Sequence, residues 1–169
     1  TEYLGLDTGA VYGALLDDMK VRYFRLMAPW YKIEPAPGKY DFSDIDWYIN
    51  EAKKRDAKVI LALGRKLFRW PECHEPAWTR ALSREQFETA VLALLQASIN
   101  HFKQYGNIIA WQIENEATLP FGECAAPKPS WSLLRREIDL VRRLDARPVI
   151  STESGELSAW LKVGGIVDW

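Results

Sequence analysis

The segment WQIENE, residues 111–116, ends an apolar run with two carboxylates and an amide. Side chains alternate along a β-strand, so we expect Glu114 and Glu116 on one side and Asn115 on the other. Glu116 would lie at the open end of the strand, where a carboxyl group can exchange a proton with a substrate. Glu114 would lie deeper, and because a lone buried charge is costly we expect it to pair with Arg25, at the end of an earlier strand. One strand-end Glu is usually structural, but three such residues together favour a functional site.

Three tryptophans also follow predicted strands, at positions 30, 70 and 78. An indole ring offers a large flat apolar face and one polar N–H group, and sugars present flat C–H faces that fit it. Any one of Trp30, Trp70 and Trp78 could instead pack its loop against the core. Together they predict a carbohydrate site lined by aromatic rings.

The loop RWPECHEP, residues 69–76, adds Glu72 and His74 as candidate substrate-binding residues. A metal site needs three or four convergent ligands, and the chain has only two His and two Cys, so we expect no metal. Cys73 and Cys124 lie in consecutive loops after predicted strands and would be neighbours in space. They could form a disulfide, which would indicate an oxidising compartment, or remain two free thiols.

Two further carboxylates, Glu153 and Glu156, follow the next predicted strand in the segment TESGE. Either could serve as a second carboxylate of an active site. The simpler interpretation of Glu156 is that it begins the short helix that follows.

Apolar and aromatic runs predict strands, and amphipathic stretches predict helices, in regular alternation. We expect strands within residues 20–30, 57–64, 107–116 and 146–154, and the opening of another at 164–169. We expect helices over residues 8–19, 44–55, 84–105, 131–144 and 157–162. Ser43 with Asp46, and Ser83 with Gln86, have the spacing of capping boxes. The alternation implies parallel strands joined by right-handed crossovers.

An α/β chain of this kind can form a (β/α)8 barrel or an open doubly wound sheet. A full barrel needs about 250 residues, so 169 residues provide about half of one. An open sheet would suit the length better, but no G-x-G-x-x-G fingerprint follows any predicted strand. Long loops with unusual residues follow the strands, while the loops at the opposite end are short. Both folds place ligand sites at that edge.

Composition argues against several classes of function. The chain is 48% hydrophobic and 27% charged with a net charge of −1, which is typical of a globular domain. The sequence has no stripe of basic residues that would predict binding of nucleic acid. Its apolar runs are too short to cross a bilayer. The sequence begins with Thr1, so we expect the natural N-terminus to be missing. Its localisation, cytoplasmic or exported, is left open.

Three segments, taken in order, resemble the retaining glycoside hydrolases of the (β/α)8 clan A. They are RLMAPWYKIEPAPGKYDFSDID, KVILALGRKLFRWPECHEPAW and NIIAWQIENE. The W-Q-x-(E/D)-N-E strand end is most similar to β-galactosidases of families 35 and 42, and the overall pattern is similar to proteins described as cellulase family glycosyl hydrolases. The resemblance implies a partial TIM barrel. Residues 1–169 would be a single domain, truncated at both ends, with barrel strands two to five and the start of strand six.

The resemblance also implies roles for individual residues. Glu116 would be the general acid/base, Asn115 would bond the 2-hydroxyl group of the sugar, and Arg25 would orient the nucleophile. That nucleophile would be a Glu at the end of strand seven, beyond Trp169. Retaining hydrolysis needs two carboxyl groups roughly 5–5.5 Å apart, so residues 1–169 alone would be inactive unless Glu153 or Glu156 substitutes.

The expected protein is therefore a glycosidase that hydrolyses β-linked O-glycosidic bonds with retention. Its partner would be an oligosaccharide or glycoside, with no cofactor and no nucleic acid. Three alternatives stay open. They are a non-catalytic carbohydrate-binding half-barrel or inactive relic, an inverting hydrolase with more widely spaced carboxylates, and an unrelated open α/β enzyme.

Overall fold

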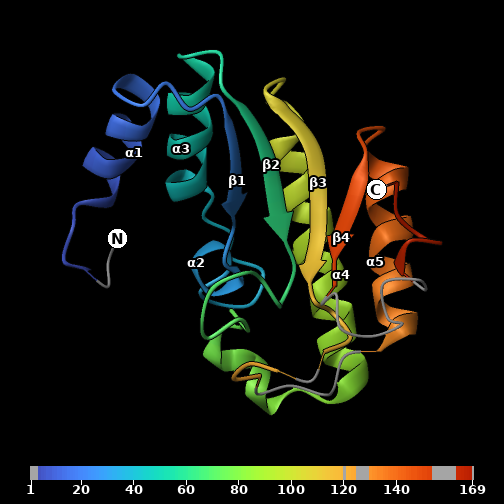
Figure 1. Ribbon diagram of the computed structural model, residues 1–169. Helices are drawn as coiled ribbons and strands as arrows, with labels where there is room; N and C mark the ends of the chain where they lie inside the picture. Colours follow the sequence, from blue (N-terminus) through green and yellow to red (C-terminus); the bar gives the residue numbers. More distant parts are fainter. Residues whose placement is uncertain (1–3, 120, 125–129, 154–162, 169) are drawn as a thin grey trace.

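The computed structural model describes residues 4–119, 121–124, 130–153 and 163–168. Four parallel strands form one sheet in the order β1-β2-β3-β4 (Figure 1). The predicted alternation of helices and parallel strands is confirmed. The strands are β1 Tyr23–Met27, β2 Lys58–Leu63, β3 Ile108–Asn115 and β4 Val149–Thr152. The helices are α1 Thr8–Asp17, α2 Trp30–Ile33, α3 Ser43–Lys53, the 3-10 helix η2 Ala77–Ala81, α4 Arg84–Phe102 and α5 Trp131–Leu144.

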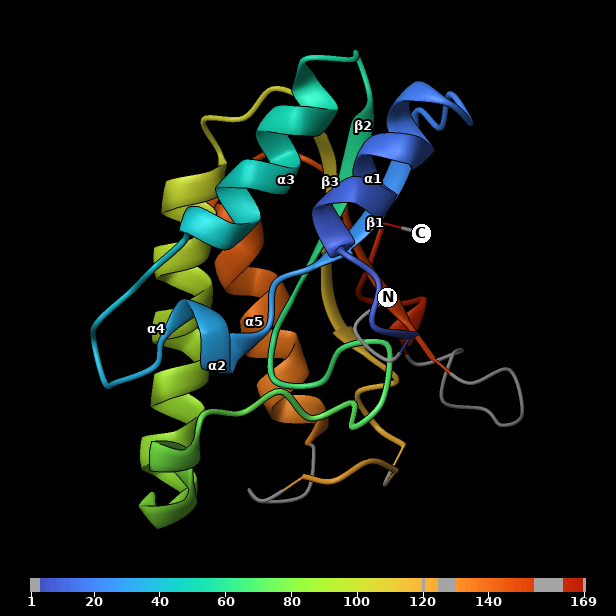
Figure 2. The same cartoon turned by 90° about the vertical axis from the view of Figure 1, so that its left-hand side faces the viewer.

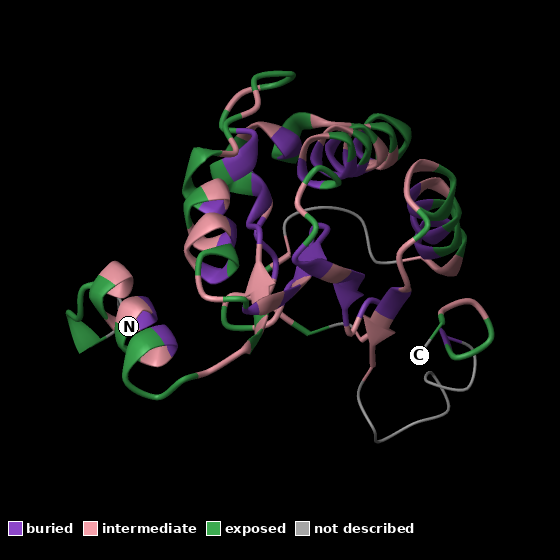
Figure 3. Ribbon diagram, turned by 90° about the horizontal axis from the view of Figure 1, so that it is seen from above, coloured by how far each residue is buried: buried purple, intermediate pink, exposed green. Residues whose placement is uncertain are grey.

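Helices α3, α4 and α5 lie along one face of the curved sheet (Figure 2). The buried residues gather between these helices and the strands, as the view from above shows (Figure 3). Within the described residues no helix covers the opposite face. This one-sided layering follows from crossover helices that all return on the same side of the sheet, as they do in a barrel.

The packing of the core explains why the sequences of β2 and β3 are almost continuously apolar. In β2, Val59 and Leu61 face the helices, and the next residues, Ala62 and Leu63, are also buried. Helix α4 contributes a buried apolar stripe that packs against the sheet. The stripe consists of Phe87, Val91, Leu94, Leu95, Ile99 and Phe102.

The two predicted capping boxes have different outcomes. At α4 the prediction is confirmed, because the Ser83 hydroxyl accepts from the backbone N–H of Gln86 and the Gln86 side chain accepts from the backbone N–H of Ser83. At α3 the prediction is wrong, since the helix already begins at Ser43. The Asp41 carboxylate accepts from the Ser43 N–H instead. A carboxylate two residues upstream thus takes the place of the serine cap.

The expected strand at residues 164–169 is not formed in the part that the structure describes. Residues 163–168 make a helical turn and bends. Asp168 donates its N–H to the Val149 carbonyl (2.8 Å), and its carboxylate accepts from the Val149 N–H (2.7 Å). The segment is therefore fastened to the start of β4. The helix expected at 157–162 lies outside the described residues, as do Glu156 and Trp169.

Candidate active site at the carboxyl ends of the strands

The end of β3 does not keep the alternation that we expected. The pairing of β3 with β4 shifts register between Gln112 and Asn115, and Glu114 has a left-handed φ of 60°. Such an irregularity rotates the following side chains to the other face of the sheet. Asn115 therefore joins Gln112 on the open face, and Glu114 turns toward the helices. The predicted sharing of one side by Glu114 and Glu116 rested on a regular strand, which β3 is not at its end.

Arg25 is the centre of a polar network on the open face. Its Nε donates to Gln112 Oε1 (2.5 Å) and its second guanidinium nitrogen donates to Asn115 Oδ1 (2.9 Å). Thr152 Oγ also donates to Asn115 Oδ1 (2.9 Å), and the Arg25 guanidinium lies 4.1 Å from the centre of the Phe68 ring. Strands β1, β3 and β4 thus each contribute one or two side chains to a single fixed cluster.

The expected pairing of Arg25 with Glu114 is wrong. Arg25 is exposed on the open face, whereas the Glu114 carboxylate accepts from the backbone N–H groups of Arg65 (2.8 Å) and Lys66 (2.7 Å). Glu114 therefore binds the loop that follows β2. Gly64 (φ 132°) makes this approach possible, because a Cβ there would collide with the Glu114 carboxylate.

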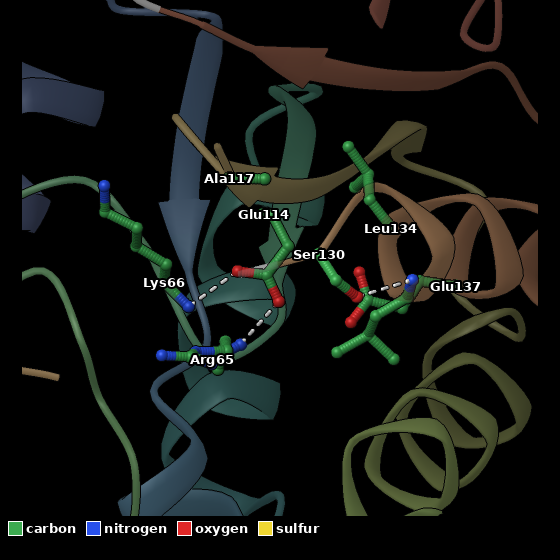
Figure 4. A pocket seen from close by; sticks show the side chains of 8 residues that line it. Arg65, Lys66, Glu114, Ala117, Ser130, Leu134 and Glu137 are labelled. Atoms are coloured by element: carbon green, nitrogen blue, oxygen red, sulfur yellow. Dashed lines mark hydrogen bonds between the residues drawn. The ribbon is translucent and has the colours of Figure 1, made fainter. Parts of the chain in front are cut away.

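A small pocket between the end of β3 and α5 contains a second buried acid, Glu137 (Figure 4). Burial raises the pKa of Glu114 to about 7, while the positive charge of Arg65 opposes this shift. Burial also raises the pKa of Glu137 well above its usual range, and the nearby Glu114 carboxylate raises it further. These two acids lie on the helix side of the sheet, on the face opposite the Arg25 cluster.

Glu116 is half-buried at the tip of β3 and has a left-handed φ of 49°. Its N–H donates to the Thr152 carbonyl (2.6 Å), and its own carbonyl accepts from Lys66 Nζ (3.0 Å). Lys66 is fully buried, donates also to the Leu119 carbonyl (2.9 Å), and pairs with Glu72 (3.3 Å). The backbone that carries Glu116 is therefore fixed from two directions.

The tryptophans divide into two groups. Trp30 is completely buried, and its indole N–H donates to the Glu34 carboxylate (2.7 Å), so the prediction that Trp30 lines a sugar site is wrong. Trp78 packs edge-on against Trp30 and donates to the Glu34 carbonyl (3.1 Å). Both rings hold the loop after β1 on the core, which is the structural role that a Trp in a Pro-rich loop often has. Trp70 alone of the three is mainly exposed.

The loop after β2 has mostly structural contacts. Glu72 is paired with Lys66. His74 is buried and stacks on Tyr31, with ring centres 6.1 Å apart, and burial lowers its pKa. Cys73 forms a disulfide with Cys124, in the loop after β3, with their Cα atoms 5.0 Å apart. These contacts engage Glu72 and His74 within the protein, where we had expected contact with substrate.

Several residues that shape the site were not singled out from the sequence. Gln112 lies inside the WQIENE segment, so the motif itself carried a signal for it. Lys66, Phe68 and Thr152 had no signal, because their roles depend on how neighbouring loops meet. Glu153 accepts from the Thr118 N–H (3.2 Å) and hydroxyl (3.1 Å), and burial raises its pKa.

Among the described residues, no group of three or more His, Cys, Asp or Glu side chains is placed to hold a metal ion. No helix in the part of the chain that the structure describes is long and apolar enough to cross a membrane.

Comparison with known proteins gives a match to a family over part of the chain and a shared fold. Residues 13–80 match glycoside hydrolase family 42, described as beta-galactosidase. The expected resemblance to (β/α)8 glycoside hydrolases is confirmed. The chain is also similar to a protein that is described as the anti-sigma-I factor RsgI6 of Acetivibrio thermocellus. The two are 30% identical over 93 residues, which are 55% of this chain and 12% of that protein.

Solved structures of glycoside hydrolases share the fold at low sequence identity. The cold-adapted β-galactosidase of Rahnella sp. R3 superposes with a TM-score of 0.73 at 15% identity, over 96% of this chain and 36% of that one. The exo-β-1,4-mannosidase of Opitutaceae bacterium strain TAV5 gives 0.69 at 17% identity, over 85% and 28%. Xylanase 10B of Thermotoga petrophila RKU-1, in complex with xylobiose, gives 0.66 at 18% identity, over 91% and 51%. The four strands are thus part of a (β/α)8 barrel fold, and the chain spans about half or less of each of these proteins.

Proposed function

We propose that the protein containing this chain is a glycosidase that hydrolyses β-linked O-glycosidic bonds with retention. The observation that carries the proposal is the cluster of Arg25, Gln112, Asn115 and Thr152 beside the end of β3, where Glu116 follows directly. A site that holds a sugar needs polar groups fixed in advance. The match of residues 13–80 to a β-galactosidase family supports the same class of reaction.

In this mechanism Glu116 protonates the glycosidic oxygen as the leaving group departs, and then deprotonates the water that attacks the glycosyl-enzyme intermediate. Both side-chain hydrogen bonds described for Asn115 use its oxygen, which leaves its NH₂ group to donate to a sugar hydroxyl. Arg25 holds Asn115 in that orientation. The nucleophilic carboxylate would come from a part of the protein outside residues 1–169.

The first test is hydrolysis of a panel of activated aryl β-glycosides by the full-length protein and its Glu116→Ala variant, with and without azide. Loss of a general acid/base should slow the reaction by about 10²–10⁴-fold, and azide should restore turnover as a β-glycosyl azide. Glu85→Ala, which removes an exposed carboxylate at the start of α4, is the matched control and should behave as wild type. Equal rates for Glu116→Ala and wild type would contradict the proposed role.

A second candidate function is a non-catalytic carbohydrate-binding half-barrel. It is favoured by one observation: the relative that is 30% identical over 93 residues is described as an anti-sigma factor, which is a regulatory role. In that case wild type would be inactive on every glycoside of the panel and would still bind oligosaccharides, and Glu116→Ala would bind them equally well.

A further inference from the structure

Two exposed aromatic rings meet at the carboxyl end of the sheet. Trp70, in the loop after β2, is 59% exposed, and Phe121, in the loop after β3, is 54% exposed. Their ring centres are 5.9 Å apart in a T-shaped arrangement. Large apolar rings that stay in water together usually mark a binding surface, and they come from loops that a barrel uses for its site.

The two loops are fastened to each other close to these rings. The disulfide joins Cys73, three residues after Trp70, to Cys124, three residues after Phe121. Glu123 donates its N–H to the Pro71 carbonyl (3.0 Å). Gly122 has a φ of 102°, and a Cβ there would lie only 3.0 Å from the same carbonyl. The rings are therefore held in place before any ligand arrives, which lowers the entropy cost of binding.

The ring pair is also tied to Glu116. The Leu119 N–H donates to the Glu116 carbonyl (3.0 Å), and the Phe121 N–H donates to the Leu119 carbonyl (2.8 Å). Lys66 Nζ contacts both of these carbonyl groups. Phe121 is five positions after Glu116 along the chain, so their Cα atoms can be no more than about 18 Å apart. That span is short enough for one oligosaccharide to reach both.

We propose that Trp70 and Phe121 form a platform for a second sugar ring, so that the substrate is an oligosaccharide and not a simple monosaccharide glycoside. This inference rests on the proposed glycosidase function and defines its substrate class. One C–H face of a pyranose ring would pack on the indole and phenyl rings and displace water from them, while its hydroxyl groups remain hydrated. The same rings would have little effect on a substrate that ends at the cleaved bond.

The test compares kcat/KM for a β-linked oligosaccharide with kcat/KM for the matching β-glycosyl fluoride, whose leaving group is a single atom. In the full-length protein, Trp70→Ala and Phe121→Ala should each lower the ratio of the two values by about tenfold, a typical loss for removing a buried aromatic contact. Tyr23→Ala, which removes an exposed ring on β1, is the control and should leave the ratio unchanged. An unchanged ratio in both platform variants would overturn the proposal, as would a change in oligomeric state in place of a change in ratio.

Direct binding separates this proposal from the proposed function. Calorimetric titration of Glu116→Gln with the oligosaccharide needs no turnover, and adding Trp70→Ala to that variant should weaken affinity about tenfold. The pair Cys73→Ser and Cys124→Ser should weaken affinity in the same direction, because the loops lose their crosslink. If wild type hydrolyses nothing but these binding losses are found, the platform stands and the glycosidase proposal fails. If hydrolysis depends on Glu116 but the binding losses are absent, the platform fails alone.

Discussion

Glu137 is an acid that the protein buries at a cost in stability. It lies on α5, across a small pocket from Glu114, and both are nearly inaccessible to water (Figure 4). Charges of both signs lie nearby. Arg65 pairs with Glu75 at 3.0 Å, and Arg136 pairs with Glu88 at 2.8 Å. Desolvation outweighs the cations, so the pKa of Glu137 lies well above its usual range.

This burial predicts a pH dependence of stability. The Glu137 carboxyl of the unfolded chain ionises near pH 4.5, whereas burial raises its pKa well above that in the folded state. The folded state therefore holds more protons above pH 4.5. The free energy of unfolding should fall as pH rises, by about 1.4 kcal/mol per pH unit for this one proton. Glu137→Gln cannot ionise in either state, and its unfolding free energy should fall less steeply between pH 5 and 7. Glu114, with a pKa of about 7, contributes to the fall in both proteins over the same range.

Denaturant unfolding at several pH values measures this difference. Glu85→Gln, at an exposed position of α4, is the control and should follow wild type. Parallel pH curves for Glu137→Gln and wild type would mean that Glu137 is ionised in the folded protein.

The positions of individual site residues were only partly predictable from the sequence. It located Asn115 and Glu116 at the end of β3, because an apolar run that stops at polar residues is visible in a single chain. Arg25 was expected at the end of a strand and lies instead in the middle of β1. The sequence misplaced Glu114, since a register shift in β3 cannot be read from alternation. It also misplaced Trp30, because the sequence does not show whether a Trp side chain is buried in the core or exposed at the surface.

The residue directly after strand β2 has no space for a Cβ atom. Gly64 has a φ of 132°, and the Glu114 carboxylate occupies the space where a Cβ would lie. Gly64→Ala should therefore displace that carboxylate from the N–H groups of Arg65 and Lys66, leaving buried polar groups unpaired. The expected loss is about 3 kcal/mol, from backbone strain and the lost hydrogen bonds.

Equilibrium unfolding of Gly64→Ala against wild type gives the measurement. Gly13→Ala is the matched control, because Gly13 lies within α1 and has no atom near the position of a Cβ. It should be stabilising by up to about 1 kcal/mol, since Ala is the better helix former. Similar small effects at both glycines would show that the Glu114 carboxylate moves aside without cost.

The elements themselves followed from pattern where their signals are local. The start of α4 was predictable because both halves of its capping box lie within four residues of each other. The start of α3 was misjudged because Asp41 competes with Ser43 for the same role. Residues 163–168 have the composition of a strand, but the Asp168 carboxylate fixes them to Val149, and a long-range contact of this kind has no sequence signal.

The sheet formed by the described residues has an unpaired strand at each of its two edges. In the part of the chain that the structure describes, β1 pairs only with β2 and β4 pairs only with β3. Tyr23, on β1, is 74% exposed. Unpaired edges with apolar side chains favour association through added strands. We expect residues 1–169, produced alone, to self-associate as concentration rises.

Light scattering across a concentration series checks this expectation. Tyr23→Lys should reduce association, because a charged side chain opposes pairing at an edge strand. Met19→Lys is the control, since Met19 is also exposed but lies outside the strands, and it should have a smaller effect. Monodisperse behaviour of the unmodified chain at all concentrations would contradict the prediction.

The architecture was the most predictable level. Alternating strands and helices with long loops at one edge indicated a partial barrel, and the parallel sheet and its structural neighbours agree. The aromatic pair of Trp70 and Phe121 was only half predictable, because Phe121 is brought to Trp70 by contacts between loops that are far apart in sequence.

The burial of Lys66 has a practical consequence for chemical labelling. Its ammonium group contacts Glu72 in the loop after β2 and carbonyl groups at and after the end of β3. In contrast, Lys20, Lys54 and Lys103 are exposed. An amine-acylating reagent applied to the native protein would therefore mark the exposed lysines and leave Lys66 unmodified. Mass spectrometry of the peptide that contains Lys66 would then report how often the loops separate, with no substrate and no knowledge of the sugar.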